Sequence, residues 1–219
     1  MSDCQLYLIT PPAIADLSDF CQRLEQALAA AKGTSAEIAC LQIRLKDAAD
    51  QDVLEAARKI LPLAHNYECA VLLNDRPDLA LEAGADGAHI GQSDMDYAQA
   101  RALLGADASI GVTCHNSRHL AMEAGEAGAD YVAFGAFYPT ATKAVTHQAD
   151  PEILTAWSQM TTVPCVAIGG ITPQNAPPLI DAGADFLAVS GSIWNHPAGT
   201  VAAIEAFAEV LSGNPAAQK

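Results

Sequence analysis

Short apolar runs alternate with longer segments of helical periodicity along the whole chain. The tetrapeptide AGAD occurs at 83–86, 127–130 and 182–185, each time closing a helical segment just before an apolar run. A glycine there is typical of a helix end that leads into a strand. The predicted strands are 6–10, 38–46, 70–74, 87–91, 109–114, 131–135, 165–170 and 186–191. The predicted helices are roughly 17–32, 51–66, 77–83, 95–104, 117–126, 150–159, 173–182 and 198–211.

Eight strand–helix units within 219 residues predict a parallel sheet that is covered by helices. A closed (β/α)8 TIM barrel, an α/β fold, accounts best for this pattern. A doubly wound open sheet is the alternative, although such sheets seldom need eight equal units. We expect a single catalytic domain over residues 1–211 and a frayed C-terminal tail over 212–219.

The charge of the chain is strongly acidic, with a formal net value of −15 and only 11 Lys and Arg. Nucleic acid is therefore excluded as a partner, because a phosphate backbone demands a basic face. No apolar run reaches the roughly 18 to 20 residues of a membrane span, and the start MSDCQLYLIT lacks the features of a secretory signal. Six cysteines without C-x-x-C spacing indicate reduced thiols, and the expected location is cytoplasmic.

Two aspartates follow neighbouring predicted strands, Asp75 after the third and Asp94 after the fourth. In a barrel the C-terminal strand ends and the loops after them build the active site. Two carboxylates together with phosphate oxygens are a usual way to hold Mg²⁺. The alternative is that each aspartate caps the helix that follows it.

The second predicted strand ends in QIRLK, where Gln42, Arg44 and Lys46 alternate with Ile43 and Leu45. Alternation sends the apolar pair to the helix layer and the three polar side chains into the barrel mouth. Two cations and an amide on one face of an apolar strand are costly without an anionic partner. The alternative is a solvated strand end whose basic residues pair with acids.

The loops after the last three strands carry further candidates. TATK after the sixth strand offers Thr140, Thr142 and Lys143, the last basic residue before Lys219, although threonines are also ordinary loop residues. Gly170 and the pair Ser190-Gly191 follow strands seven and eight, where barrels commonly bind phosphate through backbone N–H groups. The alternative is that these glycines only turn the chain. Together the rim residues predict a diphosphate held by Mg²⁺ and three cations, beside a monophosphate held by backbone.

With these residues assembled, the chain resembles the thiamine-phosphate synthase family over about residues 5–207. The matching motifs are QIRLK (42–46), LLNDR (72–76), GADGAHIGQSD (84–94), IGVTCHN (110–116), FGAFYPTATK (134–143), VAIGGITPQN (166–175) and AGADFLAVSGSI (182–193). The resemblance implies a (β/α)8 barrel with Mg²⁺ and two small-molecule substrates. A hydroxymethylpyrimidine diphosphate is joined to a thiazole phosphate, giving thiamine phosphate and diphosphate. Whether the chain forms a homo-oligomer stays open.

The resemblance also implies roles for individual residues. Those expected to contact the pyrimidine diphosphate are Gln42, Arg44, Lys46, Asn74, Thr113 and Lys143, with Arg44, Lys46 and Lys143 as catalytic residues. Those expected at the thiazole phosphate are Thr140, Thr142, Gly170, Ser190 and Gly191, and Asp75 and Asp94 are expected to bind Mg²⁺. Thr113 replaces the family's usual serine, Leu45 stands where the family usually has Glu, and Ser190-Gly191 replaces an aliphatic-Ser pair.

Two other functions stay open at this point. A thiazole tautomerase, a related family on the same fold, uses a histidine after strand five, and His115 could fill that place. The paired aspartates and the TATK loop argue against this alternative. A non-catalytic binding or regulatory protein for thiamine precursors is the second alternative, and the complete charged set argues against it. The coupling reaction needs charge neutralisation and positioning rather than a nucleophile, so Cys114 is expected to serve in packing.

Overall fold

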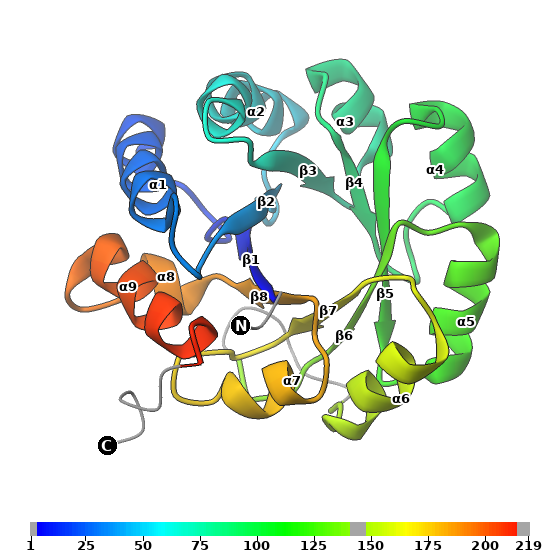
Figure 1. The fold of residues 1–219 in the computed structure, drawn as a ribbon. Helices are drawn as coiled ribbons and strands as arrows, with labels where there is room; N and C mark the ends of the chain where they lie inside the picture. The colour runs from blue at the N-terminus through cyan, green and yellow to red at the C-terminus, as the bar shows by residue number, and fades with distance from the viewer. Residues whose placement is uncertain (1–3, 141–147, 214–219) are drawn as a thin grey trace.

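The computed structural model describes residues 4–140 and 148–213, in which eight parallel strands close into a barrel ringed by helices (Figure 1). The strands are β1 (Gln5–Ile9), β2 (Ile38–Ile43), β3 (Ala70–Asn74), β4 (Gly87–Ile90), β5 (Ser109–His115), β6 (Tyr131–Gly135), β7 (Cys165–Ile168) and β8 (Phe186–Val189). The helices are α1 (Leu17–Ala31), α2 (Asp50–His65), α3 (Pro77–Ala83), α4 (Tyr97–Leu104), α5 (Arg118–Ala127), α6 (Glu152–Met160), α7 (Pro177–Asp181), α8 (Gly191–Trp194) and α9 (Gly199–Leu211).

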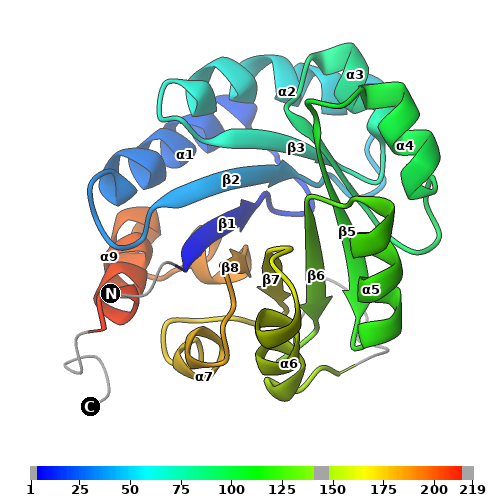
Figure 2. The ribbon, with the colours of Figure 1, turned by 45° about the vertical axis from the view of Figure 1, so that its right-hand side comes forward.

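Strand pairing confirms the predicted (β/α)8 barrel. Each strand pairs in parallel with the next one along the chain, and β1 pairs with β8, so the open-sheet alternative is wrong. The last helix, α9, packs beside the first, α1, and completes the ring (Figure 2). Within the described residues, no helix is long and apolar enough to cross a membrane.

Alternation along the strands divides the apolar side chains between two cores. The larger core lies between strands and helices and includes Ile43, Ala88 and Ile90. The smaller core fills the inside of the barrel with Tyr7, Ile9, Leu72, Tyr131, Ala133, Val166 and Ala188. Successive strand residues face opposite sides, so Gln42 and His89, which alternate with outward-facing residues, point into the barrel. Both are buried.

The three AGAD repeats join strands at the N-terminal end of the barrel. The aspartate of each repeat accepts a backbone N–H from the start of the preceding strand: Asp86 from Val71 at 2.6 Å, Asp130 from Ile110 at 2.7 Å and Asp185 from Cys165 at 2.7 Å. In each pair the aspartate N–H also donates to the carbonyl of the same partner. The repeat therefore ties β3 to β4, β5 to β6 and β7 to β8, at the face of a barrel that serves stability.

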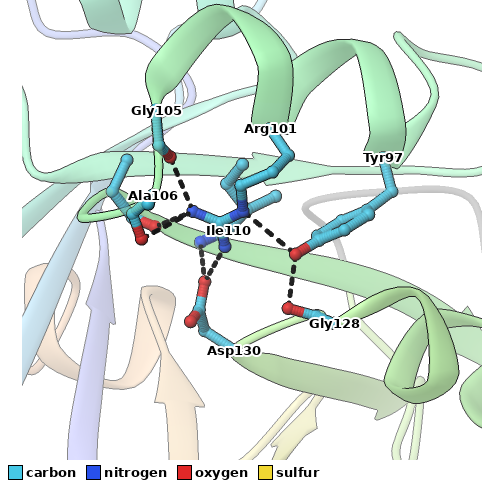
Figure 3. A network of polar contacts seen from close by, with 8 residues as sticks. Tyr97, Arg101, Gly105, Ala106, Ile110, Gly128 and Asp130 are labelled. Atoms are coloured by element: carbon cyan, nitrogen blue, oxygen red, sulfur yellow. Dashed lines mark hydrogen bonds and ion pairs between the residues drawn. The ribbon is translucent and has the colours of Figure 1, made fainter.

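Asp130 belongs to a wider polar network around Arg101, shown from close by in Figure 3. Arg101 Nη2 lies 2.6 Å from Asp130 Oδ2, and Arg101 Nη1 donates to the Ala108 carbonyl at 2.6 Å. Arg101 Nε donates to the Tyr97 hydroxyl at 3.1 Å, and that hydroxyl donates to the Gly128 carbonyl. The network fastens α4 to the segments that lead into β5 and β6.

We expect Asp130→Ala to lower the free energy of unfolding by about 1 to 3 kcal/mol. The substitution removes the acceptor for the Ile110 N–H and the charge that faces Arg101. Asp130→Asn should lose less, because an amide oxygen can still accept the N–H. Urea denaturation measures both, with exposed Asp107→Ala as the control that should change stability by under about 0.5 kcal/mol. Equal losses for Asp130→Ala and Asp107→Ala would contradict this role.

Most element boundaries lie within two residues of the prediction, and the start of α4 and the larger differences at β2 and α7 have identifiable causes. Strand β2 ends at Ile43 rather than 46, because Pro11-Pro12 follow the neighbouring strand β1 and proline cannot donate to a ladder. Helix α4 begins at Tyr97 and α7 at Pro177, later than predicted. Each is preceded by a turn in which a side chain accepts a backbone N–H: Asp94 accepts from Gly91, and Asn175 accepts from Thr172. A short additional helix, α8, follows β8.

Candidate functional site

The polar residues of QIRLK lie at different depths around the end of β2. Gln42 lies within the strand and is buried, Arg44 is half-buried just beyond it, and Lys46 is exposed in the loop. Ile43 and Leu45 pack on the outer core, as the alternation predicts. The segment therefore runs from the barrel interior to the rim, and its two cations lie at the end nearer the rim.

Asp75 follows Asn74, the last residue of β3, which is paired in register with His89 of β4. The backbone of Asp75 has φ 62° and its N–H donates to the His89 carbonyl at 2.8 Å. Asp and Asn adopt this left-handed conformation more readily than other side chains. The N-cap of α3 is Arg76, whose side chain makes no capping hydrogen bond. The capping alternative for Asp75 is therefore wrong.

Asp94 closes the turn after β4. Its Oδ2 accepts the Gly91 N–H at 2.7 Å, whereas the N-cap of α4 is Asp96, which accepts the Gln99 N–H at 2.9 Å. The capping alternative is therefore wrong for Asp94 as well. A Cβ on Gly91 would lie 2.8 Å from Asp94 Oδ2, so glycine leaves room for the carboxylate.

Both aspartates are thus anchored at the C-terminal end of β4, through the His89 carbonyl and the Gly91 N–H. Within the described residues, no group of three or more His, Cys, Asp or Glu could hold a metal ion. Two carboxylates fit the donor set of Mg²⁺, which keeps several waters and usually takes further oxygens from a phosphate. The bond from Gly91 leaves lone pairs on the Asp94 carboxylate for such a role.

Arg76, beside Asp75, is engaged elsewhere. Its guanidinium lies 2.6 Å from Asp50 and 2.6 Å from Asp78, and its hydrogen bonds hold the pKa of both carboxyl groups below the ordinary value. Arg76 therefore fastens α2 to the start of α3 and is not a candidate for holding an anion.

A hydrogen-bonded chain runs from the rim into the barrel and includes Thr113, His89, Tyr131 and Tyr7. Thr113 Oγ1 lies 2.7 Å from His89 Nε2, His89 Nδ1 lies 2.9 Å from the Tyr131 hydroxyl, and the two tyrosine hydroxyls are 2.9 Å apart. Burial raises the pKa of Tyr7 and Tyr131 well above ordinary values, so both phenols stay neutral. Gly111 makes space, because a Cβ there would lie 1.9 Å from the Tyr131 ring. The chain fixes the orientation of the Thr113 hydroxyl.

Gly170 lies in a tightly packed turn after β7. Its φ is 63°, and a Cβ would lie 2.3 Å from the Pro139 carbonyl oxygen. Asn175 shapes the turn, since its amide donates to the Gly170 carbonyl at 3.0 Å and accepts the Thr172 N–H at 2.7 Å. The Tyr138 hydroxyl donates to the Asn175 carbonyl at 2.7 Å, which joins this turn to the loop after β6.

Ser190 and Gly191 form the turn between β8 and α8. Ser190 Oγ donates to the Thr10 carbonyl at 3.2 Å, and the Trp194 ring N–H donates to the Ile9 carbonyl at 2.6 Å. The turn is therefore anchored to the end of β1. Gly191 is less crowded than Gly170, because among the described residues a Cβ there would approach Asn195 Nδ2 alone, at 3.6 Å.

The TATK run is only partly described. Thr140 is half-buried in the loop after β6, whereas Thr142 and Lys143 lie outside the described residues. At the end of β5, His115 has φ 53°, and Cys114 is fully buried. Burial raises the pKa of Cys114 to about 12, so its thiol is protonated at neutral pH and suits packing.

Residue-pattern reasoning missed His89, Tyr131 and Tyr7, and also Thr10. His89 could have been found, because a histidine between the outward-facing Ala88 and Ile90 must point into the barrel. The role of the Thr10 hydroxyl could not have been found in this way, because its bonds connect residues far apart in the sequence.

Comparison with known proteins places this geometry in a family. The family model described as thiamine monophosphate synthase matches residues 6–193. Thiamine-phosphate synthase of Rhodospirillum centenum is 58% identical over 213 residues, covering 97% of this chain and 100% of the relative. The same-named protein of Hyphomonas neptunium is 51% identical over 207 residues, covering 93% and 91%. The solved thiamine phosphate pyrophosphorylase of Pyrococcus furiosus superposes with a TM-score of 0.81 at 26% identity, covering 97% of each chain.

Proposed function

The chain belongs to the thiamine-phosphate synthase family, and we propose that it works with Mg²⁺ held by Asp75 and Asp94. Its activity is the coupling step of thiamine biosynthesis. The pyrimidinylmethyl group passes from 4-amino-2-methyl-5-(diphosphooxymethyl)pyrimidine to the ring nitrogen of the thiazole phosphate, and thiamine phosphate and diphosphate leave. The substrates are small molecules. A cytoplasmic location is part of the proposal, and six free thiols support it.

The gathering of candidate residues around the end of β4 carries this proposal. His89 bonds Thr113 through its ring, accepts the Asp75 N–H through its carbonyl, and pairs in register with Asn74. Asp94 bonds the Gly91 N–H two residues later. Thr113, Asn74, Asp75 and Asp94 are therefore all positioned against one short stretch of one strand, Thr113 and Asp94 by their side chains and the other two by their backbone. Such a rim can bind a diphosphate only if cations offset the carboxylates.

In this proposal each side chain has a limited task. Mg²⁺, when bound, neutralises charge on the diphosphate as it leaves. Arg44, Lys46 and Lys143 donate to the same group, and the hydroxyl of Thr113 is oriented toward it by His89. Gln42 and Asn74 position the pyrimidine ring. Departure of diphosphate leaves a cation stabilised by the amino-substituted ring, so positioning and electrostatics supply the catalysis.

The thiazole phosphate is assigned to the loops after the last three strands. Thr140, with Thr142 from outside the described residues, is assigned to the thiazole, and the turns at Gly170 and Ser190-Gly191 to its phosphate. The packing described for Gly170 supports a backbone role, since no side chain fits there. The bond from Ser190 Oγ to Thr10 supports the same role at the second turn.

One assay tests the function as a whole. The purified chain is mixed with the pyrimidine diphosphate, the thiazole phosphate and Mg²⁺, and thiamine phosphate and released diphosphate are measured. We expect both products in equal amounts and a loss of turnover with a chelator. Isomerisation of a thiazole carboxylate without coupling would instead favour the tautomerase alternative and His115. Binding of both substrates without turnover would favour a regulatory protein.

Gly191→Val should raise KM for the thiazole phosphate far more than it lowers kcat. That phosphate keeps its charge during the reaction, so its clamp gives equal binding to ground and transition states. The site tolerates a Cβ, whose nearest neighbour is Asn195 Nδ2 at 3.6 Å, so the fold should survive. Steady-state kinetics in both substrates measure the effect, with Gly125→Ala on α5 as the control, because a Cβ there would lie 3.7 Å from its nearest neighbours. A change confined to kcat would contradict the assignment.

A further inference from the structure

The sheet ladder between β1 and β2 changes its pattern at Thr10. The Thr10 N–H donates to the Gln42 carbonyl at 3.0 Å, as in a regular parallel ladder. The next bond of such a ladder would run from the Arg44 N–H to the Thr10 carbonyl. The Arg44 N–H donates instead to Thr10 Oγ1, at 2.9 Å.

The hydroxyl of Thr10 thus takes the place of its own carbonyl. It accepts from the Arg44 N–H and donates to the Arg44 carbonyl at 3.2 Å, so it holds that residue by both backbone groups. The Thr10 carbonyl is then available to Ser190 Oγ, which donates to it at 3.2 Å. Thr10 itself is 1% exposed, so its end of each of the three bonds is shielded from solvent.

We propose that Thr10 is a positioning residue shared by the two anion sites, its hydroxyl setting Arg44 for the diphosphate and its carbonyl setting the Ser190 turn for the thiazole phosphate. The inference rests on the proposed function, in which these two residues serve different phosphates. It adds that the two tasks are separable, because only the first depends on the side chain of Thr10.

The two tasks can be tested with separate variants. Thr10→Val keeps the shape and the carbonyl and removes the hydroxyl. We expect kcat/KM for the pyrimidine diphosphate to fall about tenfold, with KM for the thiazole phosphate unchanged. Thr10→Ser should restore the wild-type values. Ser190→Ala should give the reverse pattern, a several-fold higher KM for the thiazole phosphate with little change toward the pyrimidine.

A second readout does not depend on turnover. Inorganic diphosphate with Mg²⁺, titrated calorimetrically, should bind Thr10→Val more weakly than wild type by a similar factor, whereas affinity for the thiazole phosphate should be equal. Thr200→Val, at another buried threonine, is the matched control and should change neither affinity. Should the valine variant fail to fold, Thr10→Ala removes the same hydroxyl without seating a methyl group in its place.

The possible outcomes distinguish a failure of the proposed function from a failure of the positioning role. Absence of coupling by the wild-type chain would overturn the proposed function. Coupling by the wild type together with wild-type kinetics for Thr10→Val, or with equal losses toward both substrates, would overturn the positioning role alone.

Discussion

Asp75→Asn should remove about 10²-fold or more of the coupling activity at limiting Mg²⁺ and leave the barrel intact. The fold should survive because asparagine accepts φ 62° as readily as aspartate, and the bond from the residue 75 N–H to the His89 carbonyl is unaffected. Asp94→Asn should behave similarly, since an amide oxygen can still accept the Gly91 N–H. What each variant loses is a negative charge for Mg²⁺.

Asp96→Asn provides the control on the same loop. Asp96 caps α4 rather than facing the proposed metal, and asparagine is an equally good N-cap, so turnover should stay within about twofold of wild type. Turnover is measured as a function of Mg²⁺ concentration, beside circular dichroism and the unfolding midpoint. Near wild-type turnover of Asp75→Asn or Asp94→Asn at limiting Mg²⁺ would show that the metal assignment is wrong.

The barrel could be predicted from the sequence because its causes are local and repeated. Each AGAD copy ends a helix and begins a strand, and strand alternation fixes which residues face inward. Alternation was therefore sufficient to place Gln42 inside and Leu45 outside. The same logic predicts that Asp75 and Asp94 lie at one rim, because successive parallel strands end there.

What could not be predicted depends on contacts between distant segments. The end of β2 is decided by the prolines after β1, and the anchoring of Arg44 is decided by a hydroxyl 34 positions earlier. The AGAD pattern was visible, but the bond from each carboxylate to the start of another strand was not. The periodicity of hydrophobic positions along the sequence indicates which face of an element a residue occupies. It does not indicate which residue of another segment the fold brings to that face, and these bonds depend on that.

Arg44→Ala should lower kcat by about 10²- to 10³-fold, about 3 to 4 kcal/mol of barrier. The diphosphate gains charge as the C–O bond breaks, so a cation at its oxygens binds the transition state more strongly than the substrate. The fold should tolerate the change, because Thr10 holds this segment through the backbone N–H and carbonyl of Arg44 and through the carbonyl of Gln42. Lys143→Ala should behave in the same way, although its position lies outside the described residues.

The control for Arg44 is Arg58→Ala, which removes the same charge from an exposed position on α2. Its kcat should be close to that of wild type, because a surface charge far from the rim is screened within roughly 10 Å at 0.1 M salt. Single-turnover kinetics with saturating substrates separate the bond-breaking step from product release. Of the two anions in the proposed site, the diphosphate gains negative charge during the reaction and the thiazole phosphate does not. Arg44→Ala should therefore change the chemical step and leave KM for the thiazole phosphate nearly unchanged. If Arg44→Ala altered only the KM for the thiazole phosphate, Arg44 would have to be assigned to the thiazole phosphate and the backbone turns to the diphosphate.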